Sequence, residues 1–165
     1  MTAFRPMRRN RQQLSREECE RILGRCTSGV LALTGDGGYP YAVPLSYVYA
    51  GGAIIFHSAV QGHKVDAIRR DSRCSFCVIE QDQIMPAEFT TYFRSVIAFG
   101  RIRILEEADE KVQALRLLGR RYSPNDEPGL QHEIDKSLDH VLLLCLDIDH
   151  LSGKQAVELL QSGKP

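Results

Sequence analysis

Short, mostly apolar runs rich in β-branched and aromatic residues recur along this chain, separated by polar and glycine-rich segments, which is a pattern of β-strands. Residues 30–34, 41–49 and 53–57 form three such runs, and glycine-rich segments separate them. Such short connections cannot hold a parallel crossover, so we expect three antiparallel strands in a meander. Pro44 lacks the backbone amide that a ladder needs, which predicts a sheet edge or a bulge for the second strand.

Later in the chain, three more runs indicate strands. Residues 74–79 and 92–105 are rich in β-branched and aromatic residues, and the second run alternates over most of its length. Residues 141–148 are mostly apolar and predict a buried final strand. The pattern therefore predicts about six strands, most of them antiparallel.

Helical spacing marks other parts of the chain. Ser15 and Glu18 fit a capping box, in which each side chain bonds the backbone amide of the other residue, so a helix is expected to begin there. Residues 64–70 and 106–122 also predict helices, and a further short helix is considered after the turn at 124–129. Helices outside antiparallel strands predict a mainly β fold, a small β-barrel with peripheral helices. The chain has neither a G-x-G-x-x-G fingerprint nor a P-loop, so a Rossmann or nucleoside-triphosphatase fold has no support.

Length and charge narrow this picture. The 165 residues, 43% of them hydrophobic, favour one domain over residues 1–165, with residues 1–13 as an N-terminal arm. The 21 basic and 21 acidic residues cancel, which argues against nucleic acid or a membrane surface as the main partner. The arginines of the arm are typical of a nucleic-acid arm, but more often of a solvated segment or one folded against a partner subunit.

The cysteines indicate a reducing compartment. Cys74 and Cys77 have C-x-x-C spacing, but within a strand their side chains face opposite sides of the sheet, so neither a disulfide nor a metal site is expected. Five scattered cysteines fit reduced thiols. No apolar run of about 18 residues or secretory signal is recognisable, and we expect a cytoplasmic protein.

The segment 56–64 carries the clearest candidate chemistry. A strand end is followed by Gly62 and by a helix whose first turn holds His63 and Lys64. Helix N-termini offer free amides and partial positive charge, so this corner suits a phosphate. The alternative is a relaxed turn beside a solvated lysine. His57 is a candidate proton donor, although a lone histidine at a strand end is more often structural.

Several segments in order resemble one protein family. They are MRR at 7–9, PYAVPLSY at 40–47, FHSA at 56–59, GHK at 62–64, YFRSVIAFG at 92–100 and EK at 110–111. Together they resemble the pyridoxamine 5′-phosphate oxidase-like split-barrel proteins that bind flavin mononucleotide (FMN), and within them the nitroimidazole-resistance branch. The resemblance spans roughly residues 7–154.

The resemblance implies an antiparallel split-barrel homodimer with one FMN in each of two clefts between subunits. The flavin ring would lie along the backbone of the second strand, the phosphate in the corner after the third, and a polar contact would come from the other subunit. The implied residues are Ala42, Val43, Pro44 and Leu45 at the ring, His57, Ser58, Gly62, His63 and Lys64 at the phosphate, and Ser95 from the partner. The chain has no tryptophan and no basic residue at Tyr41 or Ala42, unlike the oxidase itself, so vitamin B6 synthesis is not expected.

The resemblance favours an FMN-dependent reductase. It would pass electrons, with reduced nicotinamide as a candidate donor, to small planar acceptors such as nitroaromatic or 5-nitroimidazole compounds, and His57 would supply a proton. The alternative is a non-catalytic protein on the same barrel that stores or senses flavin, deazaflavin or haem, with His57 or His63 as an axial haem ligand. A third alternative is a structural dimer with a vacant cleft.

Overall fold

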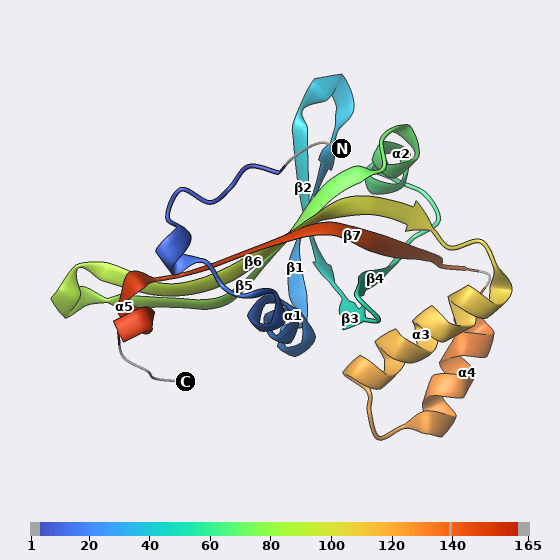
Figure 1. The fold of residues 1–165 in the computed structure, drawn as a ribbon. Coiled ribbons are helices and arrows are strands. Elements are labelled where there is room, and N and C mark those ends of the chain that lie inside the picture. Colours follow the sequence, from blue (N-terminus) through green and yellow to red (C-terminus); the bar gives the residue numbers. More distant parts are fainter. Residues whose placement is uncertain (1–3, 139, 162–165) are drawn as a thin grey trace.

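A computed structural model describes residues 4–138 and 140–161 as one antiparallel sheet with helices around it (Figure 1). The seven strands pair in the order β2-β1-β5-β6-β7-β4-β3. Their bounds are β1 Ser28–Thr34, β2 Pro40–Ser46, β3 Val48–Ala50, β4 Ala53–Ser58, β5 Arg73–Met85, β6 Thr90–Ile104 and β7 Leu142–Gln155. The predicted mainly β, antiparallel fold is confirmed, with one strand more than the six expected.

Within the described residues, five α-helices lie around the sheet. They are α1 Arg16–Arg25, α2 His63–Arg70, α3 Ala108–Tyr122, α4 Glu127–Ser137 and α5 Val157–Gln161, and the 3-10 turns are η1 Asn10–Gln12, η2 Asp36–Gly38 and η3 Pro86–Glu88. The capping box is confirmed, because the Glu18 amide donates to Ser15 Oγ and the Ser15 amide donates to Glu18 Oε2. Helices α3 and α4 pack as a pair beside β3 and β4, at the opposite end of the molecule from the β5–β6 hairpin (Figure 1).

Strand β4 separates two apolar clusters. On the barrel side, Phe56 is fully buried and meets Phe76 edge to face at 5.0 Å between ring centroids. On the helix side, Ile55 packs with Leu118 of α3 and Leu143 of β7. Successive residues of a strand face opposite sides of its sheet, so this alternation assigns each residue of β4 to one cluster.

The predicted meander is only partly correct. Strand β2 pairs with β1 and β3 pairs with β4, both antiparallel as expected, but β2 and β3 lie at opposite edges of the sheet. Strand β4 also pairs with β7, placing Ile55 opposite Cys145. The run 41–49 breaks at Tyr47, a fully buried residue whose amide donates to Tyr122 Oη and to the carbonyl of Thr27. Periodicity predicts strands but not their partners, and this break sends the chain to the far edge of the sheet. The edge position that Pro44 predicted for β2 is confirmed.

Strand β5 extends six residues beyond its predicted run, which ended at residue 79, whereas β6 lies close to the predicted 92–105; together they form a long hairpin that projects from the barrel (Figure 1). Residues 80–83 of this hairpin are all polar, so they carry no apolar alternation that would predict a strand. The hairpin holds three exposed apolar side chains: Ile79, Ile84 and Phe89.

Candidate functional site

The loop after β4 leads into helix α2, whose N-terminus has no side-chain cap. Gly62 is the N-cap of α2 at φ 129° and ψ 169°, a conformation that only glycine adopts readily, and no side chain caps the helix. The amides of Val65 and Asp66 donate to the carbonyl of Gly62. The amides of His63 and Lys64 belong to the first turn, where no intrahelical acceptor exists, so they are available to an anion.

Lys64 is held at this N-terminus without a counter-charge. Its side chain is half-buried and forms no ion pair or hydrogen bond within residues 4–138 and 140–161. Burial lowers the pKa of its ammonium group. A cation here opposes the helix dipole as well as losing hydration. Both unfavourable effects would be relieved by a bound anion.

Ser58 lies at the other end of the same loop. Its residue is only 5% exposed, on the barrel side of β4 with Phe56. Its hydroxyl forms no hydrogen bond with any residue that the structure describes. An unpartnered hydroxyl and an unpartnered lysine at the two ends of one short loop fit a ligand with oxyanion character.

A stack of side chains brings β2 to this corner. The His63 ring lies on the Tyr41 ring with 4.1 Å between centroids, and its Nε2 is 3.7 Å from Asp36 Oδ2. Arg70 of α2 also pairs with Asp36, at 3.0 Å. The His63 side chain is therefore occupied by the β1–β2 turn, so the group that His63 offers to an anion is its backbone amide.

Strand β2 presents an open backbone edge next to the corner. Val43 and Leu45 pack on the barrel core, whereas Ala42 and Pro44 are exposed. Among the described strands, β2 pairs only with β1, which leaves the amides and carbonyls of its outer side without strand partners. Such an edge fits the predicted contact with a planar ring through backbone groups.

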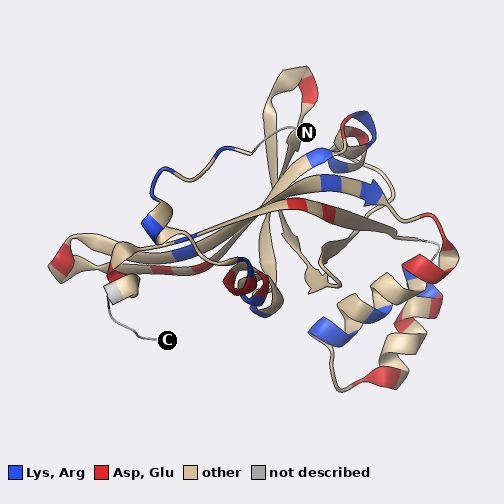
Figure 2. Ribbon diagram, viewed as in Figure 1, with Lys and Arg blue, Asp and Glu red and all other residues tan. Residues whose placement is uncertain are grey.

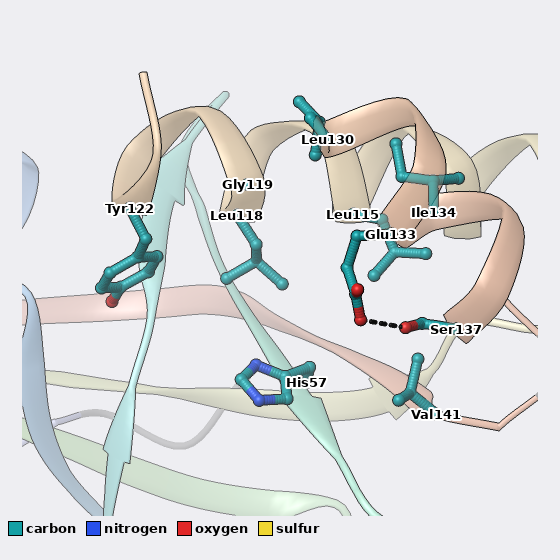
Figure 3. Close-up of a pocket in the computed structure, with 10 residues that line it drawn as sticks. All are labelled: His57, Leu115, Leu118, Gly119, Tyr122, Leu130, Glu133, Ile134, Ser137 and Val141. Carbon is teal, nitrogen blue, oxygen red and sulfur yellow. Dashed lines mark hydrogen bonds between the residues drawn. The ribbon is translucent and has the colours of Figure 1, made fainter. Parts of the chain in front are cut away.

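His57 does not join this corner. It precedes Ser58 in β4, so its side chain faces the opposite side of the sheet, where it lines a pocket of about 410 Å³ under α3 and α4 (Figure 3). The other lining residues are Leu115, Leu118, Gly119, Tyr122, Leu130, Glu133, Ile134, Ser137 and Val141. His57 and Ser58 therefore face opposite sides of β4, and the expectation that both hold one phosphate stays a prediction that this geometry does not favour.

This pocket is largely apolar, with a few polar groups. Within α4, the Ser137 hydroxyl donates a hydrogen bond of 2.7 Å to the carboxylate of Glu133, one turn earlier. The His57 ring faces this pair from strand β4 (Figure 3). Sequence reasoning missed the pocket. The spacing of Leu130 and Ile134, one helical turn apart, could have indicated an apolar face of α4 that packs on another element. The helix was expected, but no packing partner was predicted for it.

Ser95 lies away from the corner within one chain. It is half-buried in β6, between Ile79 of β5 and Lys154 of β7, and two strands separate β6 from β2 in the sheet. Val96 faces the barrel core, so Ser95 faces the outer side of the sheet. Its contact with a partner's flavin stays a prediction.

The structure also locates the cysteines. Cys74 is buried and Cys77 is half-buried on the other side of β5, as predicted, and all five thiols are free. Within the described residues, no group of three His, Cys, Asp or Glu side chains is arranged to hold a metal ion. No described helix has the length and apolar character needed to cross a membrane.

Comparisons with known proteins agree with this architecture. No curated protein matches the chain. Among solved structures, a conserved hypothetical protein of Mycobacterium tuberculosis aligns with a TM-score of 0.81 at 20% identity, over 97% of this chain and 94% of that one. A protein of Mycobacterium smegmatis described as binding FAD and haem gives 0.76 at 25% identity, over 88% and 74%. A putative 5-nitroimidazole antibiotic resistance protein of Bacteroides thetaiotaomicron gives 0.74 at 19%, over 87% and 86%.

The family assignment rests on a match across most of the chain. The family model described as pyridoxamine 5′-phosphate oxidase matches residues 15–155. This range includes every described strand and residues 58–64, the loop and first turn of α2 that are called the α2 corner below. The solved structures support the same split-barrel fold. The chain belongs to the pyridoxamine 5′-phosphate oxidase family.

Proposed function

We propose that the protein is an FMN-binding oxidoreductase that reduces small planar acceptors, such as nitroaromatic or 5-nitroimidazole compounds. The α2 corner, residues 58–64, carries the proposal: an uncapped helix N-terminus, the half-buried Lys64 and the hydroxyl of the largely buried Ser58 lack protein partners among the described residues. These groups fit a phosphate monoester. Family membership supports a flavin as the molecule that carries this phosphate. The structural likeness to the putative 5-nitroimidazole antibiotic resistance protein supports the acceptor class.

The residues of the chain bind and orient the cofactor in this proposal. The amides of His63 and Lys64, with the ammonium of Lys64, hold the phosphate, while the outer backbone edge of β2 lies along the ring. The bound flavin supplies the electron transfer, with reduced nicotinamide as the proposed donor. Because His57 faces the helix-side pocket, a proton from it would reach only an acceptor bound on that side.

A homodimer belongs to the same proposal. The β5–β6 hairpin exposes Ile79, Ile84 and Phe89, the last 97% exposed, which is an arrangement that favours burial against a second copy. Ser95 would reach a flavin only across such an interface, because it lies far along the sheet from its own corner. Sedimentation of the wild-type protein and of Phe89→Asp tests this: a dimer that the substitution weakens supports the proposal, and a wild-type monomer contradicts it.

The helix-side pocket favours a second candidate, a haem-binding storage or sensing protein on the same barrel. An imidazole in an apolar pocket is a suitable axial ligand, and His57 is placed in that way. The solved Mycobacterium smegmatis protein is described as binding both FAD and haem. The two functions predict different absorption spectra.

The decisive experiment is a spectrum of the purified protein before and after adding FMN, a reduced nicotinamide and then a nitroimidazole under anaerobic conditions. The reductase proposal predicts flavin bands that bleach with the nicotinamide and recover with the acceptor. A Soret band that disappears in His57→Ala would favour the haem candidate. Bound flavin that no nicotinamide reduces, or reduced flavin that no acceptor reoxidises, would contradict the reductase.

A further inference from the structure

The N-terminal arm is attached to β7 at two points. Phe4 stacks on His150 with 4.6 Å between ring centroids and planes 9° apart. At its other end the arm is fixed by a bridge between Gln13 and Lys154. Next to this bridge, the Leu14 amide donates a 2.9 Å hydrogen bond to the carbonyl of Gly153.

The close approach at Gly153 makes the second attachment specific. A Cβ on this glycine would lie 2.3 Å from Cys19 Sγ and 2.9 Å from Leu14 Cβ, so a side chain there would push the arm off the strand. The arm is thus placed by ring stacking at Phe4 and by packing and a backbone hydrogen bond at its other end.

Between these points the arm has more chain than it needs. Phe4 and Gln13 are nine residues apart, whereas His150 and Lys154 are four residues apart on a strand. Four strand residues span only about 13 Å. The arm therefore bows outward (Figure 1). It borders an open hollow of about 360 Å³ lined by Met7, Arg8, Arg9 and Lys154.

Three cations surround this hollow without counter-charges. Arg8, Arg9 and Lys154 form no ion pair or hydrogen bond through their side chains with any residue that the structure describes. Figure 2 shows the arm as a basic segment of a chain whose formal net charge is zero. Lys154 is positioned over the ring of Phe93, 5.1 Å from its centroid. The arrangement concentrates positive charge in a concave site whose size falls within the range of small-molecule pockets.

We infer that this hollow is a binding subsite for the diphosphate group of a nucleotide-bearing small molecule. Two arginines and a lysine match the several charges and the oxygen acceptors of a diphosphate. A small molecule fits better than nucleic acid, because the charge lines a single hollow instead of a long stripe and the rest of the chain adds no net positive field.

The position of Lys154 suggests what the diphosphate belongs to. Lys154 lies directly across from Ser95 in the β6–β7 ladder. If the proposed function holds, Ser95 faces the flavin of the partner subunit, so the hollow opens beside that cofactor. A diphosphate there would belong to an FAD in place of FMN or to the nicotinamide dinucleotide that donates electrons, and both share the same chemistry.

Calorimetric titration with inorganic pyrophosphate tests the subsite. All variants carry Lys64→Ala, which removes the lysine of the α2 corner from the measurement. We expect salt-sensitive binding that weakens at least about tenfold in Arg8→Gln/Arg9→Gln, the loss of one or more charge-assisted hydrogen bonds. The matched control is Arg21→Gln/Arg101→Gln, which alters two exposed arginines elsewhere and should leave the affinity unchanged. Lys154→Gln is a second test if the arm double variant is poorly folded by circular dichroism.

Three results would overturn the subsite: no pyrophosphate binding, an equal loss in the control, or a single-stranded oligonucleotide that binds more tightly and depends on the same arginines. With Lys64 restored, FAD, FMN and NADPH affinities identify the source. A lower FAD-to-FMN affinity ratio in Arg8→Gln/Arg9→Gln indicates a flavin dinucleotide, and a selective loss of NADPH indicates the donor. If flavin does not bind but pyrophosphate still depends on Arg8 and Arg9, the proposed function fails and the subsite stands.

Discussion

Ser58 and His57 are neighbours in β4, yet their side chains face opposite sides of the sheet. Ser58 faces the barrel side, at one end of the loop that leads to Lys64, where unpartnered polar groups gather around a helix N-terminus. His57 faces the helix side, in a mostly apolar pocket closed by α3 and α4. The comparison teaches that one strand of a split barrel can separate an anion site from an apolar site by the alternation of its side chains alone. Changes on the two faces should therefore have independent effects.

The largest expected effect is on the barrel face. Phe56→Ala removes a fully buried ring that packs edge to face on Phe76, and should lower the free energy of unfolding by about 4 kcal/mol. Leu118→Ala on the helix face borders the open pocket and should cost only about 2 kcal/mol. Urea denaturation of the two variants measures the difference. Equal losses would mean that the two faces are equally well packed.

A smaller effect is expected at the N-cap. Gly62→Ala places a side chain at φ 129°, and should destabilise the protein by about 1–3 kcal/mol through backbone strain. The relaxed backbone would also turn the first amides of α2 away from a phosphate, so FMN should bind less tightly. Gly51→Ala in the β3–β4 turn is the control, because it also places a side chain at positive φ, here 59°, but leaves the α2 corner unchanged. If both variants bind FMN as the wild type does, the amides do not hold the phosphate.

The affinity for FMN should also depend on pH. Burial lowers the pKa of Lys64 in the free protein, so the folded state releases this proton at lower pH than the unfolded chain does. In the free protein, stability linked to Lys64 therefore rises with pH between the folded and the unfolded pKa. Phosphate binding favours the charged form, so affinity should fall as pH rises through the pKa of the free protein. Titrations of FMN into the wild-type protein and into Lys64→Met, at neutral and alkaline pH, measure this decline in affinity. The methionine cannot titrate, so an equal decline in Lys64→Met would contradict the role of Lys64.

The smallest effect on flavin is expected from His57. His57→Ala should leave the FMN affinity within about twofold and the stability within about 1 kcal/mol, because the side chain is exposed and lines the other face. Fluorescence titration checks the affinity. A tenfold loss would mean that the two faces of β4 share one ligand.

Local patterns in the sequence predicted the elements well but not their long-range partners. The capping box at Ser15, the edge position of Pro44 and the helix after Gly62 each depend on nearby residues, and the structure has all three. Strand β4 pairs with the adjacent β3 on one side, but its partner on the other side, β7, is more than 80 residues away, and no local pattern encodes that choice. The period of two was sufficient to place His57 and Ser58 on opposite faces, whereas the family resemblance grouped them in one corner.

Contacts that cross the fold were equally hidden. The Tyr122 hydroxyl accepts a hydrogen bond from the Tyr47 amide and lies 2.7 Å from the carbonyls of Tyr47 and Thr27, which it can reach as a donor. This contact joins the end of α3 to the break between β2 and β3 and helps to close the pocket above His57. No local motif around Tyr47 or Tyr122 predicts this contact, because the two residues meet only once α3 has packed on the sheet.

The central claim is that the α2 corner holds a phosphate, and the most direct measurement compares FMN with riboflavin, which lacks that phosphate. Wild-type protein should bind FMN more tightly than riboflavin, and Lys64→Ala should reduce this ratio by at least about tenfold while riboflavin affinity stays unchanged. Lys136→Ala, at an exposed lysine of α4, should keep the wild-type ratio. Equal affinity for FMN and riboflavin in the wild-type protein, or an unchanged ratio in Lys64→Ala, would contradict the account.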